Sequence, residues 1–320
     1  MCIFRFYKLS TPHYLFALLA FILAMATVEP AIAAADKARQ SGFNSPTEAV
    51  NSLVKAVKSN DNKALKNILG PGSGKLISSG DPVTDQSDRD RFIRLYDEKN
   101  SLEQKSSSKV TLTLGKDDFV FPIPLVRKGA KWTFDTKAGR TEILNRRIGS
   151  NELASIEVLK SYLEAQREYA SKDHDDNGVL EFARRLSSTP GTRDGLYWEA
   201  REGQEPSPFG PLVAKADCEG YGDQFRAEPI KPFHGYYFKV LMKQGMNAEG
   251  GAFDYLANDR MVLGFALVAY PARYRASGVM TFIVNQGGVI FQKDLGRTTA
   301  RIAEEMTQFD PDKSWNKVEP

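Results

Sequence analysis

The sequence contains few of the side chains that usually carry nucleophilic or metal chemistry. It has two cysteines and three histidines in 320 residues. Cys2 precedes an apolar run, so Cys218 stands alone once a leader is removed, which excludes an internal disulfide and a two-cysteine metal site. His174 and His234 are too few for a histidine metal site, and no G-x-S-x-G occurs. We expect Cys218 to be half-buried on a short helix and His234 to lie at a capped strand end.

The sequence also lacks a strong excess of charge of one sign. Lys and Arg total 43 against 40 Asp and Glu, and the formal net charge is +3. The two signs are interleaved along the chain, which argues against a nucleic-acid partner. A hydrophobic content of 42% is enough to bury a core, and the length favours two domains.

Long apolar runs are rare, and the clearest one is near the N-terminus. The run YLFALLAFILAMA follows two basic residues and precedes small residues that fit an A-x-A cleavage site. We therefore expect a signal peptide over residues 1–35, cleaved after Ala33 or Ala35. An uncleaved anchor is the alternative, but roughly 13 apolar residues are short for a span that needs about 20. We expect no stable membrane span after cleavage, and a location in the periplasm or cell envelope, or secretion.

The strongest helical pattern lies mid-chain. Charged side chains alternate there with apolar ones that recur at spacings of three, four and seven: Leu153, Ile156, Leu159, Tyr162, Leu163, Tyr169 and Ala170. The pattern predicts a long amphipathic helix that begins near Asn151. An acidic glycine turn and a second short helix ending at Leu186 are predicted to follow it.

The acidic turn has part of the pattern of a calcium-binding loop. Oxygen ligands at alternate positions wrap the ion, and a glycine at the sixth position, here Gly178, allows the sharp bend. The twelfth position is Arg184 instead of a bidentate glutamate, which removes a strong ligand and adds a positive charge. A solvated turn that caps helix ends is the alternative. Calcium is the only cofactor that we consider, and its candidate ligands are Asp173, Asp175, Asn177, Val179 and Glu181.

The chain before the long helix is predicted to form helices followed by antiparallel strands. Ser45 and Pro46 give a capped helix start, a second short helix is predicted over residues 63–69, and a further helical pattern covers residues 85–96. The loop GPGSGKLISSGDP lacks the spacing of a phosphate-binding loop. The period then changes to two, with a hairpin turn at residues 128–129 and prolines that place FPIPLV at an edge or bulge. We predict an α+β cone over residues 42–147, with residues 140–148 leading into the long helix.

The chain after the acidic turn is predicted to form a second α+β domain over residues 150–310. A long irregular segment and a short helix at 212–219 lead into an antiparallel meander between residues 235 and 293. A helix over residues 298–309 closes the domain, and residues 311–320 form a tail. The predicted fold class is therefore α+β, with a helix-plus-curved-sheet cone followed by a long helix packed on a meander.

Several stretches resemble one family along nearly all of the chain. They include FNSPTEAVNSLVKAVKSND, FPIPLVRKG, KWTFDTKAGRTEILNRRIGSNEL, STPGTRDGLYW and SGVMTFIVNQGGVIFQKDLG. These blocks are similar to the exported bacterial proteins catalogued as domain-of-unknown-function family 2950. The resemblance implies export in a Gram-negative-type cell and carries no established activity or catalytic residue.

Each half also resembles a known fold. Residues 42–147 look like the cystatin-like or nuclear-transport-factor-like cone, with a W-x-F-D strand at the end of the sheet. Residues 150–310 are similar to the globular part of pseudopilins, in which a helix ending in E-Y-A precedes an acidic turn and GY-F strands. The chain departs from pilins because its long helix lies mid-chain and does not begin with a methylated hydrophobic anchor.

These observations favour an exported, non-enzymatic protein that binds an unidentified envelope component or small ligand, through the cavity of the cone or the Pro/Gly-rich loop. A hydrolase of envelope polymers is one alternative, and acidic residues at the domain junction would be its catalysts. It predicts two carboxylates about 5 to 10 Å apart in a shared cleft. An accessory of a pilus or secretion system is a second alternative.

Overall fold

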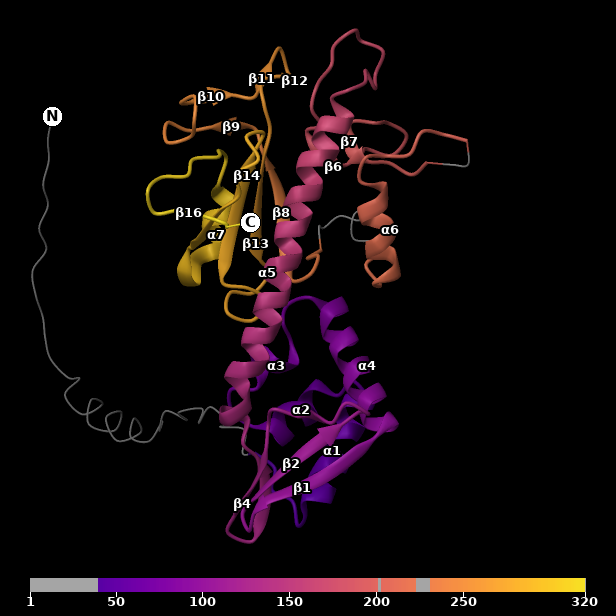
Figure 1. The fold of residues 1–320 in the computed structure, drawn as a ribbon, viewed down its shortest axis with the longest axis vertical. Helices are drawn as coiled ribbons and strands as arrows, with labels where there is room; N and C mark the ends of the chain where they lie inside the picture. Colours follow the sequence, from indigo (N-terminus) through magenta and orange to yellow (C-terminus); the bar gives the residue numbers. More distant parts are fainter. Residues whose placement is uncertain (1–39, 201–202, 223–230, 320) are drawn as a thin grey trace, which may run out of the picture. The chain divides into compact units, whose positions relative to one another are not determined.

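The computed structural model describes residues 40–319 except 201–202 and 223–230 (Figure 1). The expected signal peptide lies outside the described residues. The segment Ala38–Pro320 forms one compact unit, in which buried hydrophobic side chains gather into two clusters. The mixture of helices and antiparallel sheets confirms the α+β class, whereas the division into two domains stays a prediction.

Helices precede strands in the N-terminal half, as the sequence predicts. The helices are α1 (Pro46–Lys58), α2 (Asn62–Leu69), α3 (Gly74–Ile77) and α4 (Pro82–Glu98). The strands are β1 (Asn100–Ser106), β2 (Lys109–Leu114), β3 (Phe119–Val120), β4 (Leu125–Lys128) and β5 (Lys131–Phe134). The sheet has the order β1-β2-β4-β5, with β3 paired to β2, and every pairing is antiparallel.

Local chemistry explains where these elements begin and end. The Ser45 hydroxyl accepts a hydrogen bond from the amide of Glu48, and Pro46 follows at the first helical position, so the predicted start of α1 is confirmed. The prolines of FPIPLV lie between β3 and β4, where the strand is interrupted. Strand β1 has the sequence NSLEQKS and is exposed at all seven positions. Its residues do not alternate between apolar and polar, so the sequence pattern did not predict a strand there.

Helix α5 (Thr136–Tyr169) is longer than the sequence predicts. It begins directly after β5, with Asp135 as its N-cap, so the expectation that residues 140–148 form a connection to a helix at Asn151 was wrong. Its buried face includes Leu159 and Tyr162, as expected, but Leu153 is 67% exposed. Across the part of the chain that the structure describes, no helix is both long and apolar enough to cross a membrane.

The C-terminal half is built on a five-stranded antiparallel sheet of order β16-β15-β14-β13-β8. Helix α5 lies against one face of this sheet and α7 against the other (Figure 1), which explains why β13 is buried at all six positions. The bounds are β8 (Tyr236–Leu241), β13 (Ala266–Pro271), β14 (Met280–Asn285), β15 (Phe291–Asp294), α7 (Thr299–Glu305) and β16 (Asn316–Lys317).

Shorter elements lie between α5 and β8, between β8 and β13, and before α7. They are β6 (Arg185–Ser187), β7 (Gly195–Tyr197), α6 (Gly210–Cys218), β9 (Lys243–Gln244), β10 (Phe253–Asp254), β11 (Leu256–Ala257), β12 (Arg260–Met261) and the 3₁₀ turn η1 (Gly296–Thr298). The predicted second helix ending at Leu186 is not formed. The buried side chain of Gln166 bonds both the amide and the carbonyl of Ala183, and the Phe182 amide donates to the Met261 carbonyl. These contacts hold the segment in a non-helical conformation.

Two glycines of α5 test how closely the helix packs on the N-terminal sheet. A Cβ at Gly139 would lie 2.4 Å from the Pro122 carbonyl oxygen, whereas a Cβ at Gly149 would meet nothing within 4 Å. We expect Gly139→Ala to lower the free energy of unfolding by about 1–3 kcal/mol through overpacking. Gly149→Ala should raise it by about 0.5–1 kcal/mol, because alanine is the better helix former.

Urea denaturation of both variants checks this prediction. Equal effects of the two substitutions would show that α5 does not contact the Pro122 backbone as described.

Candidate functional site

An apolar cavity of about 400 Å³ lies inside the N-terminal half, between the helices and the sheet. Its volume falls within the range of roughly 300–1,000 Å³ that is typical of small-molecule sites. The inner walls are buried aliphatic side chains from α1, α2, α3, β2 and the β3–β4 segment: Leu53, Val57, Leu65, Leu69, Ile77, Leu114 and Ile123. The sequence places these residues on separate elements, so only the fold brings them together.

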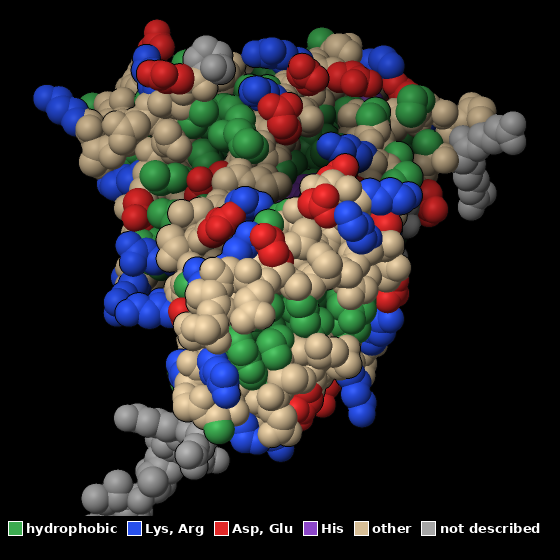
Figure 2. Space-filling model, turned by 60° about the horizontal axis from the view of Figure 1, so that its bottom comes forward, with side chains coloured by type: hydrophobic (Ala, Val, Ile, Leu, Met, Phe, Trp, Pro, Cys, Tyr) green, Lys and Arg blue, Asp and Glu red, His purple; other side chains and the backbone are tan. Residues whose placement is uncertain are grey.

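Aromatic side chains surround the outer part of the cavity. Phe92 and Phe121 make an edge contact with their ring centroids 5.5 Å apart, and both are half-buried. The Arg146 guanidinium lies 5.8 Å from the centroid of the Phe119 ring. On the face drawn in Figure 2, acidic and basic side chains are interspersed and hydrophobic side chains reach the surface between them. The cavity is thus apolar inside, with a mixed aromatic and charged outer wall.

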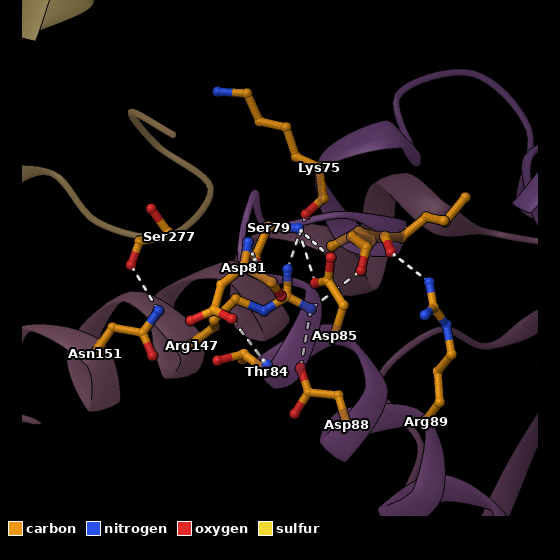
Figure 3. Close-up of polar contacts among 12 residues, drawn as sticks. Lys75, Ser79, Asp81, Thr84, Asp85, Asp88, Arg89, Arg147, Asn151 and Ser277 are labelled. Atoms are coloured by element: carbon orange, nitrogen blue, oxygen red, sulfur yellow. Dashed lines mark hydrogen bonds and ion pairs between the residues drawn. The ribbon is translucent and has the colours of Figure 1, made fainter. Parts of the chain in front are cut away.

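Arg147 contributes a mostly buried guanidinium to the cavity wall (Figure 3). Its side chain is 8% exposed and donates to the carbonyls of Lys75 and Leu76 at 2.9 and 3.1 Å, and to Asp88 at 3.1 Å. These bonds hold the short helix α3 against α5. The buried Nε of Arg147 has no hydrogen-bond partner among the described residues. Buried donors are nearly always paired, so an unpaired one is unusual. Its position in a residue of the cavity wall makes this nitrogen a donor that a bound ligand can use.

Two carboxylates line the cavity, and both already have partners. Asp85 is buried and its two oxygens accept from the Ser79 amide at 2.8 and 3.1 Å. Asp88 accepts from Arg147, as described above. Each carboxylate of α4 therefore fixes local structure: Asp85 holds the preceding loop at Ser79, and Asp88 holds Arg147 of α5.

A buried carboxylate, Asp81, is hydrogen-bonded to residues of both the N-terminal and the C-terminal half. It is fully buried and caps α4, since its Oδ1 accepts from the amides of Val83 and Thr84. Its Oδ2 accepts from the Tyr221 hydroxyl at 2.9 Å and from the Gly235 amide at 2.7 Å. Burial, and next the Asp81 charge, raise the pKa of Tyr221 above its usual range, so this hydroxyl remains a donor.

Further hydrogen bonds join the two halves around Asp81. The Lys75 ammonium donates to the Tyr274 carbonyl at 3.0 Å, and Arg273 donates to the Ser78 carbonyl at 3.0 Å. The buried Asn151 side chain donates to the Ser277 carbonyl at 2.9 Å. Asn151 itself lines the cavity, whereas Lys75 and Arg273 lie outside its lining, so these contacts position the wall.

The acidic turn is ordered by its own backbone. Asp173 accepts from the amides of Asp175, Asn177 and Gly178, and the Gly178 bond is the largest cause of a lowered Asp173 pKa. The Asn177 Oδ1 accepts from the Val179 amide and from the Arg260 guanidinium at 2.6 Å. Within the described segments, His, Cys, Asp and Glu side chains form no group of three that could hold a metal.

Two further candidate calcium ligands, Asp175 and Glu181, lie close to Arg184. Glu181 and Asp175 both line a small pocket with Arg184, and Arg184 pairs with Asp259 at 2.9 Å. The Arg184 guanidinium, at the twelfth position, therefore pairs with Asp259. The Arg260 guanidinium donates a hydrogen bond to the Asn177 side-chain oxygen of the loop. The calcium interpretation stays a prediction.

The two other residue-level expectations gave mixed results. Cys218 ends the short helix α6, as expected, but it is exposed rather than half-buried. His234 precedes β8 with a positive φ of 46° and lies 2.9 Å from a carboxylate oxygen of Glu219. Burial lowers the pKa of His234. No sequence pattern pointed to the Asp81 network or to Arg147, because their partners are far apart in the chain.

We expect Asp81→Ala to reduce the free energy of unfolding by about 3 kcal/mol, because it removes a helix cap and leaves buried donors unpaired. The matched control is Asp90→Ala on the same helix, where the exposed carboxylate bonds only Gln86 among the described residues. That substitution should change stability by no more than about 0.5 kcal/mol. Equal losses in the two variants, measured by urea denaturation, would contradict the role assigned to Asp81.

Calcium binding at the acidic turn predicts a rise in melting temperature in millimolar CaCl₂ that is absent from Asp175→Ala. The shift would arise because the ion binds only the folded loop. Calorimetric titration of both proteins provides the heat of binding. A wild-type protein with no heat and no melting shift would rule calcium out.

The family comparison agrees with the resemblance of the sequence. No curated protein and no solved structure matches the chain, so the cystatin-like and pseudopilin-like resemblances remain predictions. A family model described as "Protein of unknown function (DUF2950)" matches residues 40–318, which is most of the chain. The chain therefore belongs to the DUF2950 family of proteins of unknown function.

Proposed function

We propose that this is an exported, non-enzymatic protein that binds a small, largely apolar ligand in the cavity of its N-terminal half. The single observation that carries the proposal is the cavity of about 400 Å³, with buried aliphatic inner walls. At roughly 30 Å³ for each heavy atom, the share of one water molecule in the liquid, it would hold roughly 13 heavy atoms. The signal-peptide pattern supports export to the periplasm or cell envelope.

The aromatic residues around the cavity favour binding of an apolar group. The edge contact of Phe92 with Phe121 places two ring surfaces beside the aliphatic wall. Burial of apolar ligand surface against such side chains contributes roughly 25 cal/mol for each Å² removed from water. The apolar walls therefore supply the main attraction for such a ligand.

Binding has more support here than hydrolysis. Asp85 and Asp88 are the carboxylates of the cavity, and each is occupied by a structural partner. Polymer hydrolysis would need an acid and a second carboxylate facing one open cleft. The accessory role in a pilus or secretion system rests on the pseudopilin resemblance alone.

A blocking substitution tests the proposal. Ile143 on α5 is half-buried and lines the cavity, whereas the adjacent Leu144 is half-buried and does not line it. We expect Ile143→Trp to fill the cavity and weaken binding of the neutral probe N-phenyl-1-naphthylamine by at least about tenfold, because a filled pocket excludes the ligand. Leu144→Trp, with the same added bulk outside the cavity, should bind within about twofold of wild type.

Probe fluorescence measures the affinity, and circular dichroism confirms that both variants are folded. Unchanged probe binding by the folded Ile143→Trp variant would show that the probe does not bind in the cavity. Absence of probe binding to the wild-type protein would overturn the proposal as well.

A further inference from the structure

The charged residues of the cavity are not balanced, and this imbalance lies at its outer edge. Four guanidinium groups line the cavity against two carboxylates, which leaves a net charge of +2: Arg89, Arg91, Arg146 and Arg147 against Asp85 and Asp88. Arg91 and Arg146 are exposed, whereas the aliphatic walls are buried. The inner part of the cavity is therefore apolar, and the part nearest the solvent is cationic.

The arginines also keep hydrogen-bond donors free. Arg91 makes no hydrogen bond or ion pair with any residue that the structure describes. Within the described part of the chain, Arg89 uses only one terminal nitrogen, which bonds the Asn62 side chain and the Ile77 carbonyl at 3.0 Å. Each guanidinium has five N–H donors, so both side chains can accept a further anionic partner.

Two other guanidinium groups add to this surplus. Arg146 pairs with the exposed Glu142 and keeps its contact with the Phe119 ring. Arg147 has the buried, unpaired Nε described above. Acidic side chains use only part of these donors: Asp88 accepts one bond from Arg147, whereas Asp85 bonds the Ser79 amide instead of an arginine. Glu142 offsets one charge beside the cavity, and the outer edge remains cationic.

We propose, building on the function proposed above, that the ligand is an amphipathic anion. Its apolar part, about ten carbons long from the roughly 13 heavy atoms of the cavity, lies against the aliphatic walls. Its carboxylate or phosphate head lies at the outer edge, on Arg91 and Arg146. Arginine suits this role because its planar donor pairs match the oxygens of such a head group bidentately.

The test compares three ligands that share one apolar chain. Decanoate, 1-decanol and decyltrimethylammonium are each titrated against wild-type protein by displacement of bound N-phenyl-1-naphthylamine. We expect decanoate to bind at least about tenfold tighter than 1-decanol, as charge-assisted hydrogen bonds exceed neutral ones. The cation should bind more weakly than the alcohol.

Substitutions then locate the head group. Arg91→Gln combined with Arg146→Gln should bring decanoate to within about twofold of 1-decanol, because the charged donors are gone. Arg94→Gln is the control, since Arg94 is exposed on the same helix and does not line the cavity. It should leave the preference for decanoate unchanged. All three arginines are exposed, so their replacement should preserve the fold.

The outcomes distinguish the anionic-ligand inference from the proposed binding of an apolar ligand in the cavity. Equal binding of decanoate and 1-decanol, or tighter binding of the cation, would overturn the anionic ligand while the cavity remains a binding site. A decanoate preference that survives the double substitution would also overturn it. Failure of all three ligands and of the probe to bind would overturn the proposed function itself.

Discussion

Both hydrophobic clusters depend on one continuous helix, α5. Its first turns pack against the end of the N-terminal sheet, where Gly139 lets the Pro122 backbone approach. Its last turns bury Leu159 and Tyr162 against the C-terminal sheet. Between them, Arg147 and Asn151 bond backbone carbonyls on either side of the helix. The positions of the cavity wall and of the C-terminal sheet therefore both depend on one continuous helix.

The hydrogen bonds around Asp81 add a second constraint. A fully buried carboxylate must have its oxygens satisfied, and here two donors come from the start of α4 and two from Tyr221 and Gly235. This arrangement orients α4, whose inner face carries Asp85, Arg89 and Phe92 into the cavity lining. The proposed binding site is thus supported from outside by residues that no ligand needs to touch.

Sequence reasoning was most successful where the signal is local. The cap at Ser45, the hairpin at Lys128 and Gly129 and the α+β class all rest on neighbouring residues. It missed one local signal, the Asp135 cap that starts α5 at Thr136. It also failed where tertiary contacts decide, because residues up to Leu186 are held out of a helix by Gln166. Strand β1 has no apolar face, so periodicity could not find it.

The candidate site could be predicted only in outline. A cavity in the cone was expected, but its lining comes from seven elements and the segments between them, and Arg147 falls in a segment that was predicted to be a connection. By contrast, the acidic turn has a clear sequence pattern, and its side chains bond mainly to their own loop and to Arg260. A local motif was therefore easier to see than the site that the fold assembles.

Methyl NMR spectroscopy tests the central claim most directly. Protein labelled at Ile, Leu and Val methyl groups would be titrated with decanoate. The account predicts shifts concentrated at Leu53, Val57, Leu114, Ile123 and Ile143, which line the cavity, while Leu159 and Leu267 of the other cluster stay unchanged. Shifts centred on the second cluster, or no shifts at saturating ligand, would contradict it.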